Sequence, residues 1–200
     1  QALLRHPLAE PYTLGVSGGA ALGAIMGGLL FMKGDALGGF FLPLWAFFGA
    51  LGSTLCVYLI AGRRRFSVTT LILGGIVMNL LLSSLILLIF SLSKREQVIS
   101  LLLWLLGDLS IFQKNIILSV ALFVIIGMGA LMAFSRDLNL LTLGEEKATY
   151  LGVEVETVQK LLFVLSSLIT GACVAASGII GFVGLIIPHI VRQITGPDHR

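Results

Sequence analysis

The chain alternates between long apolar runs and short segments that carry its charged residues. Uncharged stretches cover residues 11–32, 36–62, 66–93, 115–134 and 161–191. A helix needs about 20 predominantly apolar residues to cross the hydrocarbon of a bilayer. Four of these runs have the length of one membrane-spanning helix, and the fifth, at 31 residues, is too long for one.

Glycines divide the fifth run. Three of them fall between residues 177 and 185, and Pro188 stands where a second helix can begin. We therefore predict a span over residues 161–176 and a short helix over residues 186–195, which the following Gly-Pro pair would end.

The apolar segment 98–106 is too short to cross, since nine helical residues rise only about 14 Å. Cytoplasmic loops of membrane proteins carry an excess of Lys and Arg. If this segment does not cross, the basic residues divide nine against four; if it does, they divide five against eight. We therefore predict that it stays on the external side. The predicted cytoplasmic group is Arg5, Arg63, Arg64, Arg65, Arg136, Lys147, Lys160, Arg192 and Arg200, and the external group is Lys33, Lys94, Arg95 and Lys114.

Composition supports a membrane protein with no soluble domain. Hydrophobic residues make up 57% of the chain and charged residues 12%, and the mean hydropathy is +1.04. A soluble chain carries about 25% charged residues. The net charge of +3 comes from residues between the apolar runs, so a nucleic-acid partner is not expected. We predict an all-α, polytopic helical protein in which residues 1–200 form a single transmembrane domain, truncated at both ends.

Small and polar residues inside the spans have two interpretations each. Gly15, Gly19, Gly23 and Gly27 share one helical face, which favours close helix packing, with a pore-lining ridge as the alternative. Asn79 lies in the middle of the third run, where an amide either makes an interhelical hydrogen bond or lines a pathway.

Candidate chemistry is sparse. No predicted span carries a charged residue in its interior, which counts against a proton-coupled transporter. The three histidines are scattered, and no catalytic or phosphate-binding motif is present. We expect no catalytic residue, no metal site and no cofactor in this chain.

The cytoplasmic loop 136–159 is the most informative segment. Thr142 and Glu145 have the spacing of a capping box, and Gly152 is suited to end a helix. We predict two short helices, over residues 141–146 and 147–151. Structure in such a loop indicates a docking element for a partner, with a helix lying on the membrane surface as the alternative.

Four segments resemble, in order, those of FecCD-type permeases, the membrane subunits of ABC importers for iron siderophores, haem and cobalamin. They are RHPLAEPYTLGVSGGA at 5–20, WLLGDLS at 104–110, LGE with Ala148 and LGV at 143–153, and GIIGFVGLIIPH at 178–189 with GPDHR at 196–200. The four matches at these separations cover the whole chain.

The resemblance implies a BtuC-like permease fold with ten helices in the full chain. This chain would hold helices three to eight, about six membrane helices plus a short external one. It also implies a homodimer in the lipid bilayer of a bacterial or archaeal cytoplasmic (inner) membrane. The expected partners are an ABC ATPase subunit, which binds ATP and Mg, and an extracytoplasmic substrate-binding protein.

The resemblance assigns roles to particular residues. Loop 136–159 would be the coupling loop that docks on the ATPase, and the cytoplasmic gate would lie at residues 6–8. His6 stands where the family usually has Asn, and an imidazole can titrate near neutral pH. The implied coupling residues are Leu143, Gly144, Glu145, Ala148, Leu151 and Gly152; the gate residues are His6, Pro7 and Leu8; and the pathway or packing residues are Asn79, Gly15, Gly19 and Gly23.

The sequence thus predicts a permease subunit that passes a metal chelate, with a ferric siderophore favoured, from a binding protein into the cytoplasm. Cobalamin, haem and oxyanions are the other cargoes within the family. A secondary transporter or channel that does not use ATP is the alternative, and a glycine-packed membrane scaffold without an ATPase partner is another.

The coupling assignment makes a prediction for Gly152→Asp in the complete protein. This variant should insert into the membrane normally but lose transport driven by ATP hydrolysis, because the change lies in the docking loop and outside every span. Uptake measured in cells, with membrane content checked by immunoblot, tests it. Unchanged uptake would refute the coupling role.

Overall fold

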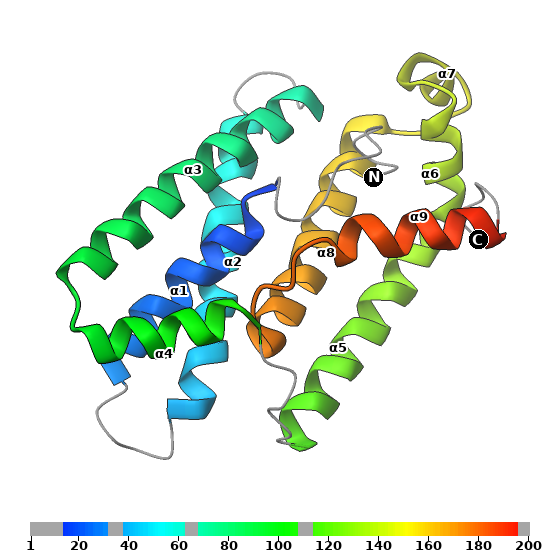
Figure 1. The fold of residues 1–200 in the computed structure, drawn as a ribbon. Coiled ribbons are helices and arrows are strands. Elements are labelled where there is room, and N and C mark those ends of the chain that lie inside the picture. The colour runs from blue at the N-terminus through cyan, green and yellow to red at the C-terminus, as the bar shows by residue number, and fades with distance from the viewer. Residues whose placement is uncertain (1–13, 32–37, 63–67, 108–113, 196–200) are drawn as a thin grey trace.

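The computed structural model describes residues 14–31, 38–62, 68–107 and 114–195, and these residues form helices and turns without any strand. Figure 1 shows α1, α2 and α3 grouped on one side and α5 with α8 on the other, with α7 at one extreme end. The helices are α1 (Val16–Phe31), α2 (Gly38–Gly62), α3 (Val68–Leu92), α4 (Arg95–Leu105), α5 (Lys114–Ala133), α6 (Ser135–Thr142), α7 (Glu145–Tyr150), α8 (Val155–Ser177) and α9 (Val183–Thr195).

Every predicted apolar segment forms a helix, and the all-α polytopic architecture is confirmed. In the described residues, α2, α3 and α8 contain stretches long and apolar enough to cross a membrane by themselves. A fourth span results if α5 and α6, which are bent by 54° at the break between them, are taken as one. With 16 and 13 residues, α1 and α9 are shorter.

The predicted starts of α8 and α9 were wrong. The predicted span 161–176 is α8, which begins six residues earlier, and Lys160 there bonds Glu156 at 2.6 Å across one turn. Such an i,i+4 pair stabilises a helix, so these charged residues lie inside α8 and do not mark its start. The predicted helix 186–195 is α9, whose first turn forms on the carbonyl of Phe182. Pro188 therefore lies inside α9 and does not start it.

The short external segment predicted at residues 98–106 is α4. It begins three residues earlier than predicted, and its 11 residues are too few to cross a bilayer. Figure 1 shows it running crosswise to α3. Leu101 of α4 is buried and Trp104 packs against the central core, so α4 is fixed on the bundle.

The predicted glycine face of α1 packs against α2. A Cβ on Gly19 would lie 2.5 Å from the carbonyl oxygen of Gly49, and a Cβ on Gly49 would lie 2.8 Å from the Cα of Gly23. Gly27 lies against Trp45 of α2, and Gly15 against the carbonyl of Gly75 on α3. The neighbouring helices occupy this face, so the structure favours the packing interpretation over a pore-lining ridge.

Small residues also dominate the core around this contact. The central cluster joins α1, α2, α3 and α8 through buried alanines and valines, with Leu14, Leu71 and Phe163 as its large members. A second cluster joins α6, α7 and α8, and Leu162 belongs to it. Consecutive residues of α8, Leu162 and Phe163, therefore belong to different cores.

The α1–α2 contact predicts opposite effects for two glycines of one helix. Gly49→Ala should destabilise the protein by about 1–3 kcal/mol, because an extra methyl group overpacks the contact. Gly52→Ala is the matched control: a Cβ there meets nothing within 4 Å, so stability should be unchanged or higher by up to about 1 kcal/mol. Thermal unfolding in detergent tests the pair, and equal melting temperatures would contradict the contact.

Candidate functional site

The candidate site is the two-helix loop, residues 136–159, formed by α6, α7 and the start of α8. Two helices were predicted here and two are present, but α6 spans Ser135–Thr142 and α7 spans Glu145–Tyr150, against the predicted 141–146 and 147–151. Figure 1 shows α7 projecting beyond the ends of α5 and α8. The loop is therefore an ordered extension of these two helices.

The two-helix loop has a hydrophobic core of its own. Leu141 of α6, Ala148 of α7 and Val158 of α8 are buried against one another, together with Val153 and Leu162. Leu131 of α5 and Phe134 at the α5–α6 bend pack on this cluster. Because these side chains come from four successive helices, the loop is fixed to both of the long helices that it connects.

The start of α7 differs from the predicted capping box. Thr142 is the last residue of α6, and its hydroxyl donates to the carbonyl of Asn139 at 2.7 Å. The N-cap of α7 is Gly144, with φ +120° and no side-chain cap. The prediction failed because α6 continues through residue 142, so Thr142 is not free to cap the next helix.

The end of α7 agrees with the predicted role of Gly152. The Gly152 amide donates to the carbonyl of Thr149 at 3.0 Å, and the Val153 amide donates to the carbonyl of Ala148 at 3.0 Å. With Gly152 at φ +87°, this pair of bonds is a Schellman motif. The contact between Val153 and Ala148 that accompanies it belongs to the loop core.

An acidic groove of about 900 Å³ lies between α7 and the first turns of α8. Its described lining includes four carboxylates and no basic side chain. Gln159 is buried at its base and donates to the carboxylate of Glu145 at 3.1 Å, which joins α7 to α8. The carboxylates of the groove are Glu145, Glu146, Glu154 and Glu156.

The predicted coupling residues divide into two kinds. Ala148 is fully buried and Gly144 and Gly152 have positive φ, so these three shape the loop. Leu143 and Leu151, each 57% exposed, face outward, as does the exposed Glu145, which lines the acidic groove. The sequence reasoning missed Tyr150, which is 90% exposed at the end of α7; a large aromatic residue in a short polar segment was the available signal.

Asn79 packs against α1. Its side-chain oxygen lies 2.5 Å from where a Cβ on Gly18 would stand, and this oxygen is buried without a hydrogen bond from any described residue. A pathway role for Asn79 stays a prediction. The predicted gate residues His6, Pro7 and Leu8 lie outside the described residues. Across the described ranges, no group of three His, Cys, Asp or Glu side chains is suited to hold a metal ion.

Two of the motifs that carry the resemblance contact each other. A Cβ on Gly178, just after α8, would lie 2.5 Å from the carbonyl oxygen of Trp104 and 2.8 Å from the Cα of Gly107. Both glycines have positive φ, +74° and +83°. The turn after α4 and the turn after α8 therefore pack backbone against backbone, which no Cβ would allow.

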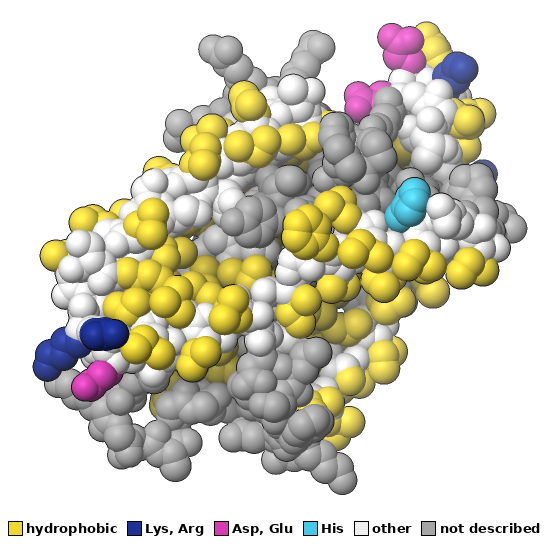
Figure 2. All heavy atoms as spheres, viewed as in Figure 1, with side chains coloured by type: hydrophobic (Ala, Val, Ile, Leu, Met, Phe, Trp, Pro, Cys, Tyr) yellow, Lys and Arg dark blue, Asp and Glu magenta, His cyan; other side chains and the backbone are white. Residues whose placement is uncertain are grey.

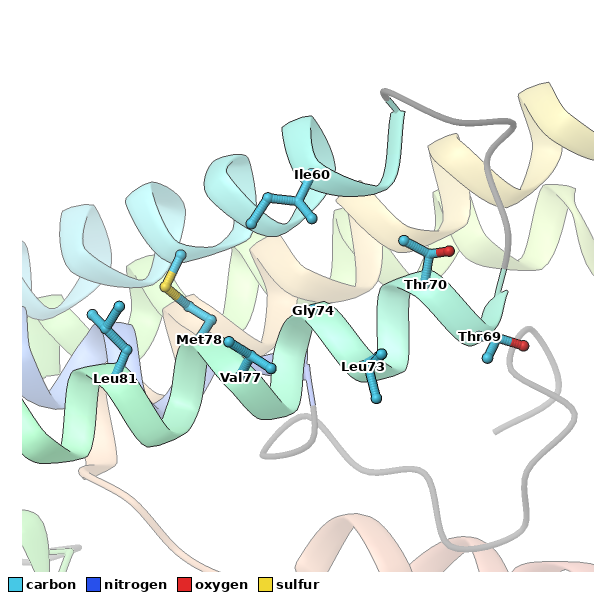
Figure 3. Close-up of a pocket in the computed structure, with 8 residues that line it drawn as sticks. All are labelled: Ile60, Thr69, Thr70, Leu73, Gly74, Val77, Met78 and Leu81. Carbon is cyan, nitrogen blue, oxygen red and sulfur yellow. The ribbon is translucent and has the colours of Figure 1, made fainter.

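An apolar groove of about 330 Å³ lies between α2 and α3 (Figure 3). Ile60 comes from α2, while Val77, Met78 and Leu81 come from α3. Thr69 and Thr70 line its end near the start of α3. No titratable side chain lines it, so it offers shape without acid–base chemistry.

These features define a multi-pass α-helical membrane protein with an ordered two-helix loop between two of its long helices. Over residues 1–200 the chain matches the FecCD transport family. It therefore belongs to that family, whose members are transport permeases and not enzymes, and it is a multi-pass protein of the cell inner membrane.

Curated relatives support this assignment. The chain is 41% identical to an uncharacterized ABC transporter permease of Bacillus subtilis, YvrB, and covers 57% of that protein. It is 37% identical to the cobalamin import system permease BtuC of Halobacterium salinarum and 36% identical to the hemin transport system permease HmuU of Yersinia pestis. All of this chain is matched in each case, and it spans between 53% and 60% of these three relatives.

A solved structure has the same fold. It is an inward-facing conformation of a transporter described as a metal-chelate type ABC transporter, with a TM-score of 0.87 and 32% sequence identity. The match covers all of this chain and 63% of that one.

The core of the two-helix loop predicts a contrast between two leucines. Leu141→Ala should destabilise the loop by about 2–5 kcal/mol, because Leu141 is only 2% exposed and its truncation leaves a cavity. The amide hydrogens of Ala148 and Val153 should then exchange faster, while those of α2 and α3 stay protected. Leu143→Ala, at an exposed position of the same loop, is the control and should leave exchange unchanged. Equal exchange in both variants would argue against a separate loop core.

Proposed function

We propose that the chain is part of a permease subunit in an ATP-driven importer that passes a ferric siderophore from a binding protein into the cytoplasm. The two-helix loop receives the motion of an ATPase subunit, and the spans open and close the path. ATP and Mg bind to the ATPase, and a second copy of the permease completes the path.

The single observation that carries this proposal is the loop core. A flexible loop would absorb a push from a partner as local motion of the chain. Here α7 is packed on α5 and α8 through the cluster around Leu141 and Ala148. A displacement of α7 therefore reaches both long helices through packed side chains, as ATP-driven transport requires.

The exposed faces of the spans support burial of the chain against lipid and a second copy. Along α3, Leu73, Leu80 and Leu87 are each more than 60% exposed. Figure 2 likewise shows hydrophobic side chains over much of the visible surface. In the bilayer these faces contact acyl chains or other permease helices, so their exposure here carries no cost in the membrane.

Several findings favour an iron chelate as cargo. The hemin relative is named for an iron chelate and the solved neighbour for metal chelates, whereas the cobalamin relative is named for a cobalt chelate. The groove between α2 and α3 is apolar, and no group of three His, Cys, Asp or Glu side chains in the described residues could hold a metal ion. A chelate enclosed in its organic ligand is compatible with such surroundings, because it needs no direct protein ligand to the metal.

The test is uptake by proteoliposomes that contain the complete permease and its ATPase, with the binding protein and cargo outside. We expect ATP-dependent accumulation of a radio-labelled ferric hydroxamate chelate, and none with a non-hydrolysable ATP analogue. An ATPase variant that binds but does not hydrolyse ATP is the matched control.

Two outcomes would count against the proposal in different ways. Uptake that continues without ATP would favour a secondary transporter or channel. ATP-dependent uptake of cobalamin without uptake of the ferric chelate would keep the importer assignment and reject the cargo.

A further inference from the structure

Three large exposed apolar side chains lie at the ends of α7, and no described part of the chain covers them. Tyr150 is 90% exposed, and Leu143 and Leu151, at the two ends of α7, are each 57% exposed. We call these three residues the α7 anchor. Figure 2 shows acidic, basic and hydrophobic side chains gathered at this projecting end of the molecule.

The backbone beneath the anchor is fixed. The Leu151 amide donates to the carbonyls of Lys147 and Ala148, both at 3.1 Å, and the two bonds of the Schellman motif follow directly. Ala148, two residues before Tyr150, is fully buried in the loop core. Tyr150 is therefore presented on a preorganised turn, which lowers the entropy that a partner must remove on binding.

Either the membrane surface or a partner protein could cover the α7 anchor. The charge next to the anchor distinguishes between these two. Tyrosine is common both at membrane interfaces and in protein interfaces. The acidic groove with Glu145, Glu146 and Glu154 lies directly beside α7. The cytoplasmic leaflet is itself negative and attracts basic segments, so it repels this groove. A protein surface with basic residues complements the groove.

We infer that Tyr150 is the main anchor of the ATPase interface, inserting with Leu143 and Leu151 into an apolar cleft whose rim carries Lys or Arg side chains facing the acidic groove. This inference rests on the proposed function and adds to it the residue and the surface chemistry. Tyrosine supplies a large, stiff contact area, and such aromatic residues dominate binding energy in interfaces.

The first experiment measures the affinity of the complete permease in nanodiscs for its ATPase. Tyr150→Ala should raise Kd about 30-fold, the loss typical of a buried aromatic anchor. Tyr150→Phe should stay within about threefold of the parent protein, because the ring supplies most of the contact area. Amide exchange at Val153 should be the same in all variants, which separates lost contact from a misfolded loop.

Matched changes elsewhere on the chain control for general effects. Leu151→Ala should weaken binding, whereas Leu92→Ala, at an 82% exposed leucine at the end of α3, should not. Glu146→Lys should weaken binding and reduce its salt dependence, because an attractive pair with the partner is lost. Glu96→Lys on α4 is the charge control and should leave both unchanged.

The outcomes separate the inference from the proposed function. If the parent permease binds the ATPase but Tyr150→Ala binds within twofold of it, the anchor is refuted and the importer assignment stands. If the parent permease does not bind the ATPase, both fail.

A second measurement addresses the membrane directly. An environment-sensitive dye on Thr149→Cys, at an exposed position next to the intact Tyr150, with Cys56 and Cys173 replaced by serine, should shift to shorter wavelength only when the ATPase is added. A shift in the nanodisc alone would place the end of α7 in the bilayer and overturn the inference.

Discussion

The architecture depends on one close contact, the backbone approach of α1 to α2. In lipid the hydrophobic effect does not drive helices together, so van der Waals packing between backbones takes a larger share. Gly19, Gly23 and Gly49 remove the Cβ atoms that would hold the two helices apart. The central core then needs only small side chains, and its alanines follow from that short separation.

The candidate site depends on a different kind of packing. Leu141, Val158 and Leu162 form a core at the end of the long helices, where ordinary hydrophobic burial from water operates. The loop is therefore stabilised independently of the glycine contact. An apolar interior beneath an acidic, tyrosine-bearing exterior suits the docking role that we propose for this loop.

The sequence was sufficient to predict which segments form helices, but not to predict the residues at which these helices begin and end. Apolar runs predicted every long helix, because charge is excluded from the hydrocarbon. Charges at Glu156 and Lys160 hid the true start of α8, since a helix can continue through charged residues when they pair across one turn. Thr142 fitted a capping pattern, but only the length of α6 decided that its hydroxyl bonds backward.

The coupling residues were named through a resemblance, and the structure divides them by exposure. The positive φ at position 152 explains why glycine is found there, and a sequence pattern can suggest such a position. The outward direction of Tyr150 depends on the phase of a six-residue helix, which short-range periodicity does not fix. Likewise, nothing in the sequence spacing indicates that the turns at Gly107 and Gly178 meet.

The division of α8 between two cores has a mechanical consequence. Leu162 lies in the core of the loop and its neighbour Phe163 in the core of the bundle, and α8 is continuous between them. No turn or break that could act as a hinge separates the two cores along α8. A rotation of α8 that repacks one core must therefore repack the other.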